Sequence, residues 1–413
     1  GIIVLPIGQD INSFTPVQHP ANDMTTDTVT THFDYHSIDH NLLKLDILGH
    51  DDPTMIRMLQ DLTGVDPLTI PLDGQDVMSL FQNTEALGIT PSQIGGTKLG
   101  CLGIPEFGTD FAMNMVIEAA PRSFSDLVRI SGLSHGTNVW VGNAQDLIRE
   151  GTATISTCVC TRDDIMTYLI NKGVEPEKSF KIMEAVRKGQ VAKKKVNPDL
   201  WKEWKEDMLA HDVPQWYIDS CQKIEYMFPK AHAAAYVMMA WRIAYCKIHY
   251  PLAYYGAFFS IRAKAFSYEQ MCQGQGHLEA VMAEYRRRMD AVAAKEAGAV
   301  PLSNKEELAF GDMRIVQEMY ARGFEFMPID IFSAHSRSFR IVEGKLMPSL
   351  SSIEGVGEAA ADAIMEAAKD GPFLSRDDFR ERTKVSKTVV DLMAGLGILG
   401  NLPESNQLSL FDL

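Results

Sequence analysis

The chain has 413 residues with 39 basic and 54 acidic side chains, and apolar residues make up 46% of it. This length favours about two to four domains, and the apolar content excludes a largely disordered chain. The net charge of −15 repels a polyanion at long range, so nucleic-acid binding would have to depend on local basic clusters. The longest apolar stretch, residues 231–243, is interrupted by polar side chains and too short for a membrane span.

The six cysteines form no CxxC pair and no regular framework. They indicate a reducing compartment, for which the cytoplasm is the default, and no zinc site is expected. The first residues form an apolar run without the basic segment of a signal peptide. We expect the chain to begin inside a domain.

In chain order, the pattern changes from strand-forming to helical and back. Residues 1–75 open with short runs of β-forming residues between polar turns, and residues 76–300 have helical periodicity with start and stop signals. Residues 301–400 begin with a helix, continue with two short strands and end in two helical hairpins, and residues 401–413 form a tail without helical period. The sequence predicts a mainly α fold with some β, an α+β multidomain chain.

A glycine motif at 353–364 has the order apolar-x-Gly-apolar-Gly followed by an Ala-rich helix. Gly355 and Gly357 allow a tight turn, after which the amides at the start of the next helix can approach a phosphate. A weaker copy at 386–400 predicts a tandem arrangement. The alternative is a helix pair with glycine at its turn and no ligand.

A second candidate site lies at residues 226–247, where Pro229 and Lys230 precede a long apolar helix. A cation beside free amides suits a triphosphate. Helical spacing puts His232 and Tyr236 on one face. The alternative is a buried helix with a hydrogen-bonded histidine.

A third candidate is Asp46 in the apolar strand LLKLDILG. Nucleotidyl transfer needs two divalent ions held by carboxylates, although an aspartate in a strand is more often a solvent-facing residue. A fourth is the segment at 407–411 near the C-terminus, which resembles the pentapeptide that binds bacterial sliding clamps. Its apolar side chains would be exposed to water unless a partner's pocket received them.

Six segments together resemble the bacterial C-family replicative DNA polymerases, in particular the PolC branch. They are LLKLDILGHDDPT, SFSDLVRISGLSHGTNVWVGNAQDLI, RDDIMTYLI with KIMEAVRKG, FPKAHAAAYVMMAWRIAYCKIHYP, the glycine motif and QLSLF. The resemblance covers essentially the whole chain. It implies the end of the palm at 1–75, the fingers at 76–300, the small β pieces and a tandem helix-hairpin-helix DNA-binding region at 301–400, and the clamp-binding tail at 401–413.

The resemblance also implies roles for individual residues. Asp46 matches the third metal-binding aspartate of the palm, part of a Mg²⁺ site whose other two aspartates lie upstream, so the chain alone is expected to be inactive. The implied nucleotide-binding residues are Lys230, His232 and Tyr236, with Arg122, Arg129 and Arg242 as further phosphate partners. Gly355 and Gly357 would bind DNA, and the clamp-binding residues would be Gln407, Leu408, Leu410 and Phe411.

The implied function is template-directed DNA synthesis from dNTPs in the cytoplasm. The expected partners are primer–template DNA, dNTP, the sliding clamp and other replisome subunits, with no membrane. One competing hypothesis is a non-catalytic DNA-binding and clamp-binding accessory protein, which would have no use for Asp46 or the FPKAHAAAY segment. Another is a purely structural helical scaffold. An Asp-x-Asp strand upstream of Gly1 in the full gene would favour the polymerase.

Overall fold

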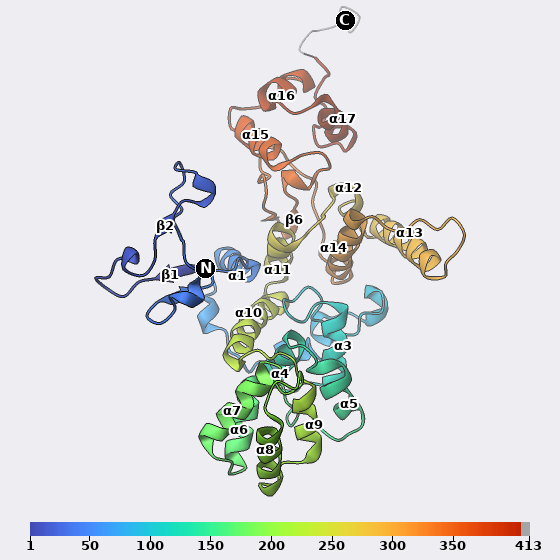
Figure 1. The fold of residues 1–413 in the computed structure, drawn as a ribbon. Coiled ribbons are helices and arrows are strands. Elements are labelled where there is room, and N and C mark those ends of the chain that lie inside the picture. The colour runs from blue at the N-terminus through green and yellow to red at the C-terminus, as the bar shows by residue number, and fades with distance from the viewer. Residues whose placement is uncertain (406–413) are drawn as a thin grey trace, which may run out of the picture. The chain divides into compact units, whose positions relative to one another are not determined.

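The computed structural model describes residues 1–405, and these form two compact units, 1–51 and the chain from Asp52 onward. The fold is mainly helical with three two-stranded antiparallel sheets, which confirms the predicted class (Figure 1). None of the described helices is long and apolar enough to cross a membrane.

The smaller unit contains two strand pairs and little regular structure besides. In the first pair Ile2 lies opposite Leu45, and in the second Val17 lies opposite Thr31. Most side chains of the first pair are exposed although several are apolar. The four strands are β1 (Ile2–Val4), β2 (Val17–Gln18), β3 (Thr30–Thr31) and β4 (Leu43–Leu45).

The larger unit begins with helices that share one hydrophobic core. Figure 1 shows α6 to α9 gathered near α4 and α10, and the core extends from Met55 to Leu346. These helices are α1 (Asp51–Thr63), α2 (Gln75–Ser79), α3 (Asp110–Ala119), α4 (Phe124–His135), α5 (Gln145–Arg149), α6 (Arg162–Asn171), α7 (Pro176–Arg187), α8 (Pro198–Ala210), α9 (Gln215–Lys223), α10 (Lys230–His249), α11 (Pro251–Ala257), α12 (Tyr268–Met271), α13 (Gln275–Ala293) and α14 (Asn304–Ala321).

A second core lies under the C-terminal helices and includes Leu350, Ile364 and Phe379. It is preceded by the strand pair β5 (Arg340–Val342) and β6 (Lys345–Met347), as the sequence predicts. The elements that follow β6 are the 3₁₀ turn η9 (Leu350–Ser352), α15 (Glu358–Ala368), α16 (Arg376–Thr383) and α17 (Lys387–Gly395).

Local sequence explains where these helices begin and end. Ser303 and Glu306 form a reciprocal capping box at the start of α14. Helix α10 starts after Pro229 and stops just before Pro251, which starts α11 in a position where its missing N–H costs nothing.

Candidate nucleotide and nucleic-acid sites

The segment that leads into α10 is fixed by backbone contacts from three other parts of the fold. The loop after α4, the last turn of α7 and the first residue of α6 each contribute one. The contacts join Thr137 N–H to Tyr226 O at 2.9 Å, Met227 N–H to Arg187 O at 3.3 Å and Arg162 N–H to Phe228 O at 3.2 Å. Because these are main-chain contacts, they set the position of the first turn of α10 independently of most side chains.

Lys230 begins α10 between two acidic residues of α6. Its backbone N–H donates to Asp163 Oδ2 at 2.6 Å, and its Nζ lies 3.5 Å from Asp164 Oδ1. Asp163 therefore caps a helix that has no capping side chain of its own. A phosphate that bound the Lys230 ammonium group would replace Asp164 as its partner.

Aromatic rings line the face of α10 next to Lys230. The His232 ring stacks on Phe228 with centroids 4.9 Å apart and lies 4.6 Å from the Tyr236 ring. Burial lowers the pKa of His232, and the nearby His135 ring lowers it further. His232 is therefore held toward its neutral form, with one ring nitrogen able to donate and one able to accept. The structure brings Lys230, His232 and Tyr236 together as predicted, while their roles remain predictions.

The three arginines proposed as phosphate partners lie in two different places. Arg129 Nη1 lies 3.3 Å from Asp126 Oδ1, and the same carboxylate accepts the backbone N–H of Arg122 at 3.0 Å. Both residues thus lie around the start of α4, where the Arg122 side chain is exposed. Arg242 is on α10 but about 18 Å further along the axis than Lys230. It lines a small cavity with Ile56, and its buried Nε has no hydrogen-bond partner among residues 1–405.

Asp46 follows β4 rather than lying within it. Its side chain is 59% exposed, and its Oδ1 is 3.3 Å from Lys44 Nζ. Residues 1–405 contain no cluster of three or more His, Cys, Asp or Glu side chains that could hold a metal ion. An exposed carboxylate fits one oxygen ligand of Mg²⁺, and the described residues do not supply the rest of such a site.

The glycine motif forms the turn between η9 and α15. Gly355 has φ +78°, a conformation that favours glycine, and Gly357 is the N-cap of α15. A Cβ placed on Gly357 would meet no atom within 4 Å. The space in front of the α15 amides is therefore open to an approaching group.

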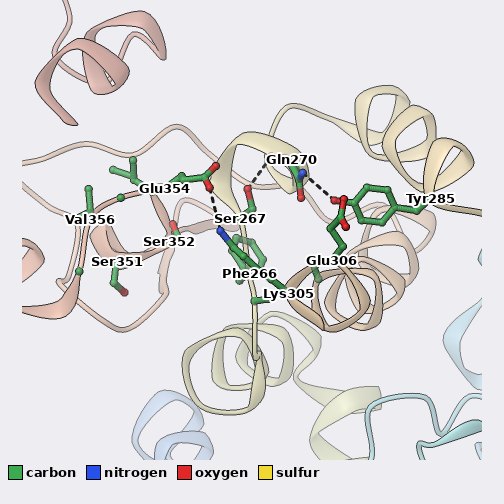
Figure 2. A pocket seen from close by; sticks show the side chains of 15 residues that line it. Phe266, Ser267, Gln270, Tyr285, Lys305, Glu306, Ser351, Ser352, Glu354 and Val356 are labelled. Atoms are coloured by element: carbon green, nitrogen blue, oxygen red, sulfur yellow. Dashed lines mark hydrogen bonds and ion pairs between the residues drawn. The ribbon is translucent and has the colours of Figure 1, made fainter. Parts of the chain in front are cut away.

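A cavity of about 550 Å³ lies between this turn and the start of α14. Figure 2 shows Lys305 and Glu354 pointing toward each other across it, with Nζ and Oε1 3.0 Å apart. Glu354 N–H donates to Glu269 Oε1 at 3.0 Å, and Glu306 is held by Arg288. Because carboxylates surround the turn, a phosphate entering the cavity would have to compete with Glu354 for Lys305.

The second glycine segment does not form the predicted hairpin. Gly395 ends α17, and turns rather than a helix follow it up to residue 405. Its glycines end a helix because Gly397, at φ +74°, takes the left-handed conformation common after a helix C-terminus. Helices α16 and α17 are joined instead through Lys384, which has φ +59°. The proposed clamp-binding residues 407–411 lie outside the described residues.

Sequence reasoning missed two residues beside the α10 rings, Glu106 and His135. His135 Nε2 lies 2.6 Å from Glu106 Oε2, and the His135 ring is 5.7 Å from that of His232. Lys247, which follows the nucleotide motif, is fully buried beside Glu318 and cannot reach a ligand. His135 stands in one of the segments that carry the family resemblance, and this was the available signal.

The similarity to known proteins extends along the whole chain. Residues 52–212 match the family model described as bacterial DNA polymerase III alpha subunit finger domain, and residues 323–408 match a helix-hairpin-helix motif. The chain is 52% identical over 412 residues to DNA polymerase III PolC-type of Streptococcus pyogenes serotype M5 (strain Manfredo). It is 53% identical to the same protein of Streptococcus agalactiae serotype III (strain NEM316). The chain is homologous to part of PolC-type DNA polymerase III.

The matches cover 100% of this chain but 27% of each of these PolC-type relatives. The finger match runs from the second residue of α1 through α8, and the helix-hairpin-helix match contains the Gly355 turn and α15 to α17. Both are consistent with the C-terminal part of such a polymerase.

Proposed function

We propose that the chain is a portion of a DNA-directed DNA polymerase that extends a primer on template DNA from dNTPs. The observation that carries this proposal is homology to PolC-type DNA polymerase III at about half identity along the entire chain. An accessory protein would need only the hairpin and the tail, whereas the similarity here includes the finger domain.

In the proposed reaction the 3′-hydroxyl oxygen of the primer forms a bond to the α-phosphorus of the dNTP, and the bond to the bridging oxygen breaks. The hydroxyl proton passes to solvent water and pyrophosphate leaves. Mg²⁺, when bound, would supply electrostatic stabilisation of the negative charge that develops in this step. Asp46 would supply one ligand, together with carboxylates outside this chain.

The start of α10 is the proposed nucleotide site. Lys230 would pair with a phosphate in place of Asp164, and the rings of His232 and Tyr236 would contact the nucleotide. Arg129 and Arg122 are placed around the start of a helix that packs on α10 and would add positive charge. For Arg242 the distance along α10 favours a different role, such as packing against α1.

The Gly355 turn is the proposed contact with duplex DNA. Backbone amides at the start of α15 would bind phosphates without regard to base sequence. Binding would also use Lys305 once it is released from Glu354.

Residues 407–411 are the proposed clamp-binding peptide. Burying Leu408, Leu410 and Phe411 would contribute roughly 1.5 to 3 kcal/mol each, offset by about 1 to 2 kcal/mol per ordered residue. The expected affinity is modest, which suits a tether that raises the local concentration of the clamp while allowing exchange. The partners proposed for the whole enzyme also include other replisome subunits, and the proposed location is the cytoplasm.

The test uses primer extension by the full-length polymerase with Lys230→Ala. Loss of the phosphate partner should raise KM for dNTP by about tenfold or more, with little change in DNA affinity. The matched control is Lys223→Ala, which removes an exposed lysine that donates to Gly142 O. Equal KM values for Lys230→Ala and the control would contradict the nucleotide site.

Two further measurements separate the other parts of the proposal. Asp46→Asn in the full-length polymerase should abolish extension while leaving DNA binding intact, and normal extension would contradict its role as a ligand. A peptide of residues 402–413 should bind the sliding clamp, and its variant with alanine at 410 and 411 should not. Equal binding of the two peptides, or none by either, would contradict the clamp assignment.

A further inference from the structure

A buried ion pair lies beneath the loop formed by residues 100–108. Lys247 and Glu318 are both fully buried, with Nζ 2.8 Å from Oε1. Lys247 also donates to the backbone oxygens of Gly100 and Leu102, each at 2.7 Å. Glu318 accepts a second hydrogen bond from Tyr255 Oη at 2.7 Å. The hydrogen bonds of the two side chains thus go to each other, to this loop and to Tyr255 on α11. Together they fix the position at which the loop starts.

The rest of the loop folds closely on itself. A Cβ on Gly103, which has φ +76°, would lie 2.6 Å from Tyr254 Oη, and one on Gly108 would lie 2.7 Å from Gly103 N. Between these two glycines stands Glu106 with φ +68°. The left-handed conformation is unfavourable for a residue with a side chain, so the surrounding structure has to stabilise Glu106 there.

The Glu106 carboxylate contacts His135, the last residue of α4. Oε2 and Nε2 lie 2.6 Å apart, a contact that is an ion pair when the imidazole is protonated, although Glu106 Oε2 has no hydrogen-bond partner among residues 1–405. Both side chains are largely buried. A partner at one edge of an imidazole restricts rotation of the ring. The pair therefore sets how the His135 ring faces its other neighbours.

Those neighbours are the rings at the start of α10. His135 lies edge-on to Phe228 at 5.5 Å, to His232 at 5.7 Å and to Tyr236 at 6.3 Å. The next residue, Gly136, has no room for a Cβ, which would lie 2.8 Å from Tyr226 O. The tightly packed backbone at Gly136 and the contact with Glu106 thus hold His135 against the proposed nucleotide site.

We propose that Glu106 and His135 are positioning residues for an incoming nucleoside triphosphate, and that the buried Lys247–Glu318 pair anchors the loop that carries Glu106. The contact between Glu106 and His135 holds the rings of His232 and Tyr236 in the orientation that receives the nucleotide. This inference rests on the proposed function of the α10 site. It gives a role to four buried or half-buried ionisable groups, Glu106, His135, Lys247 and Glu318, that no direct ligand contact explains.

The test is Glu106→Gln in the full-length polymerase, because glutamine keeps the shape of the side chain and removes its charge. KM for dNTP should rise about tenfold with kcat changed less than about twofold, since the pair positions the ligand and does not touch the reacting atoms. The matched control is Asp76→Asn. It removes the carboxylate 2.7 Å from His249 Nε2, at the opposite end of α10. Asp76→Asn should leave KM unchanged.

A double-mutant cycle supplies the second variant. His135→Gln should raise KM as much as Glu106→Gln, and the double variant should be no worse than either, because both act through one contact. Additive effects, an unchanged KM in Glu106→Gln, or an equal rise in Asp76→Asn would overturn the inference. If Lys230→Ala still raised KM, the proposed nucleotide site would stand without it. If neither Lys230→Ala nor Glu106→Gln altered KM, the nucleotide site itself would be wrong.

Discussion

Replacing Lys247 by methionine should strongly destabilise the larger unit. Methionine has a similar length and no charge, so the change removes the ammonium group and leaves Glu318 fully buried with Tyr255 Oη as its remaining hydrogen-bond donor. Gly100 O and Leu102 O would also lose the hydrogen bonds from Lys247, and Leu102 O would keep only the 3.4 Å contact with Tyr254 Oη.

The expected loss in the free energy of unfolding follows from this geometry. Removing one partner of a buried ion pair costs about 3 to 5 kcal/mol, because the other charge stays buried without compensation. Lys178→Met is the control, since Lys178 Nζ lies 2.9 Å from Asp207 Oδ2 at a partly exposed site. That change should cost only about 0.2 to 1 kcal/mol.

The assay is urea unfolding of the 413-residue chain, followed by tryptophan fluorescence. Trp241 is a suitable probe because it is buried on α10 and stacks near Phe81 with ring centroids 6.4 Å apart. Adding Glu318→Gln to Lys247→Met should recover part of the loss, since the buried charge is then gone. If Lys247→Met were as stable as Lys178→Met, or if the double variant were no more stable than Lys247→Met, the anchoring role would be refuted.

Three further predictions concern pH, backbone conformation and DNA binding. Burial raises the pKa of Asp312 from 3.8 to about 6. The folded state therefore binds this proton more tightly than the unfolded state. The stability of the unchanged chain relative to Asp312→Asn should fall by roughly 2 to 3 kcal/mol between about pH 4 and pH 7. A stability difference that does not change with pH in urea unfolding would contradict this. Gly189→Ala should lower the free energy of unfolding by several kcal/mol more than Gly298→Ala in the same assay. Both glycines have positive φ, but only at 189 would a Cβ lie 2.3 Å from a backbone oxygen. Equal losses would show that the segment entering α10 can shift. Glu354→Gln should release Lys305 and tighten duplex binding several-fold in fluorescence anisotropy, with a steeper salt dependence; unchanged affinity would mean that phosphates do not enter this cavity.

Much of the local structure follows from the sequence because local signals determine it. The helix that opens residues 301–400, the strand pair from Arg340 to Met347 and the Gly355 turn are all predicted, and the structure contains them. Each depends on residues close in the chain, whose backbone preferences act whatever packs around them. Helical spacing likewise placed His232 and Tyr236 on one face of α10, where their rings are 4.6 Å apart.

Where two structures share a local signal, the sequence could not choose between them. Glycines at 395 and 397 are compatible with a hairpin turn and with a helix end, and the second is what the chain adopts up to residue 405. The choice depends on whether the next residues can form a helix against the core. The spacing of apolar residues around Gly395 does not show whether the next residues can form such a helix.

The contacts that define the candidate site depend on the tertiary structure alone. Glu106 meets His135, and Lys247 meets Glu318 and the oxygen of Gly100, across long separations in the chain. In the sequence Lys247 is one more cation near the end of a helix, which commonly lies in solvent. Only packing shows that it is buried, and burial is what makes its pairing obligatory, because an unpaired charge in the core would cost more than the fold can offset.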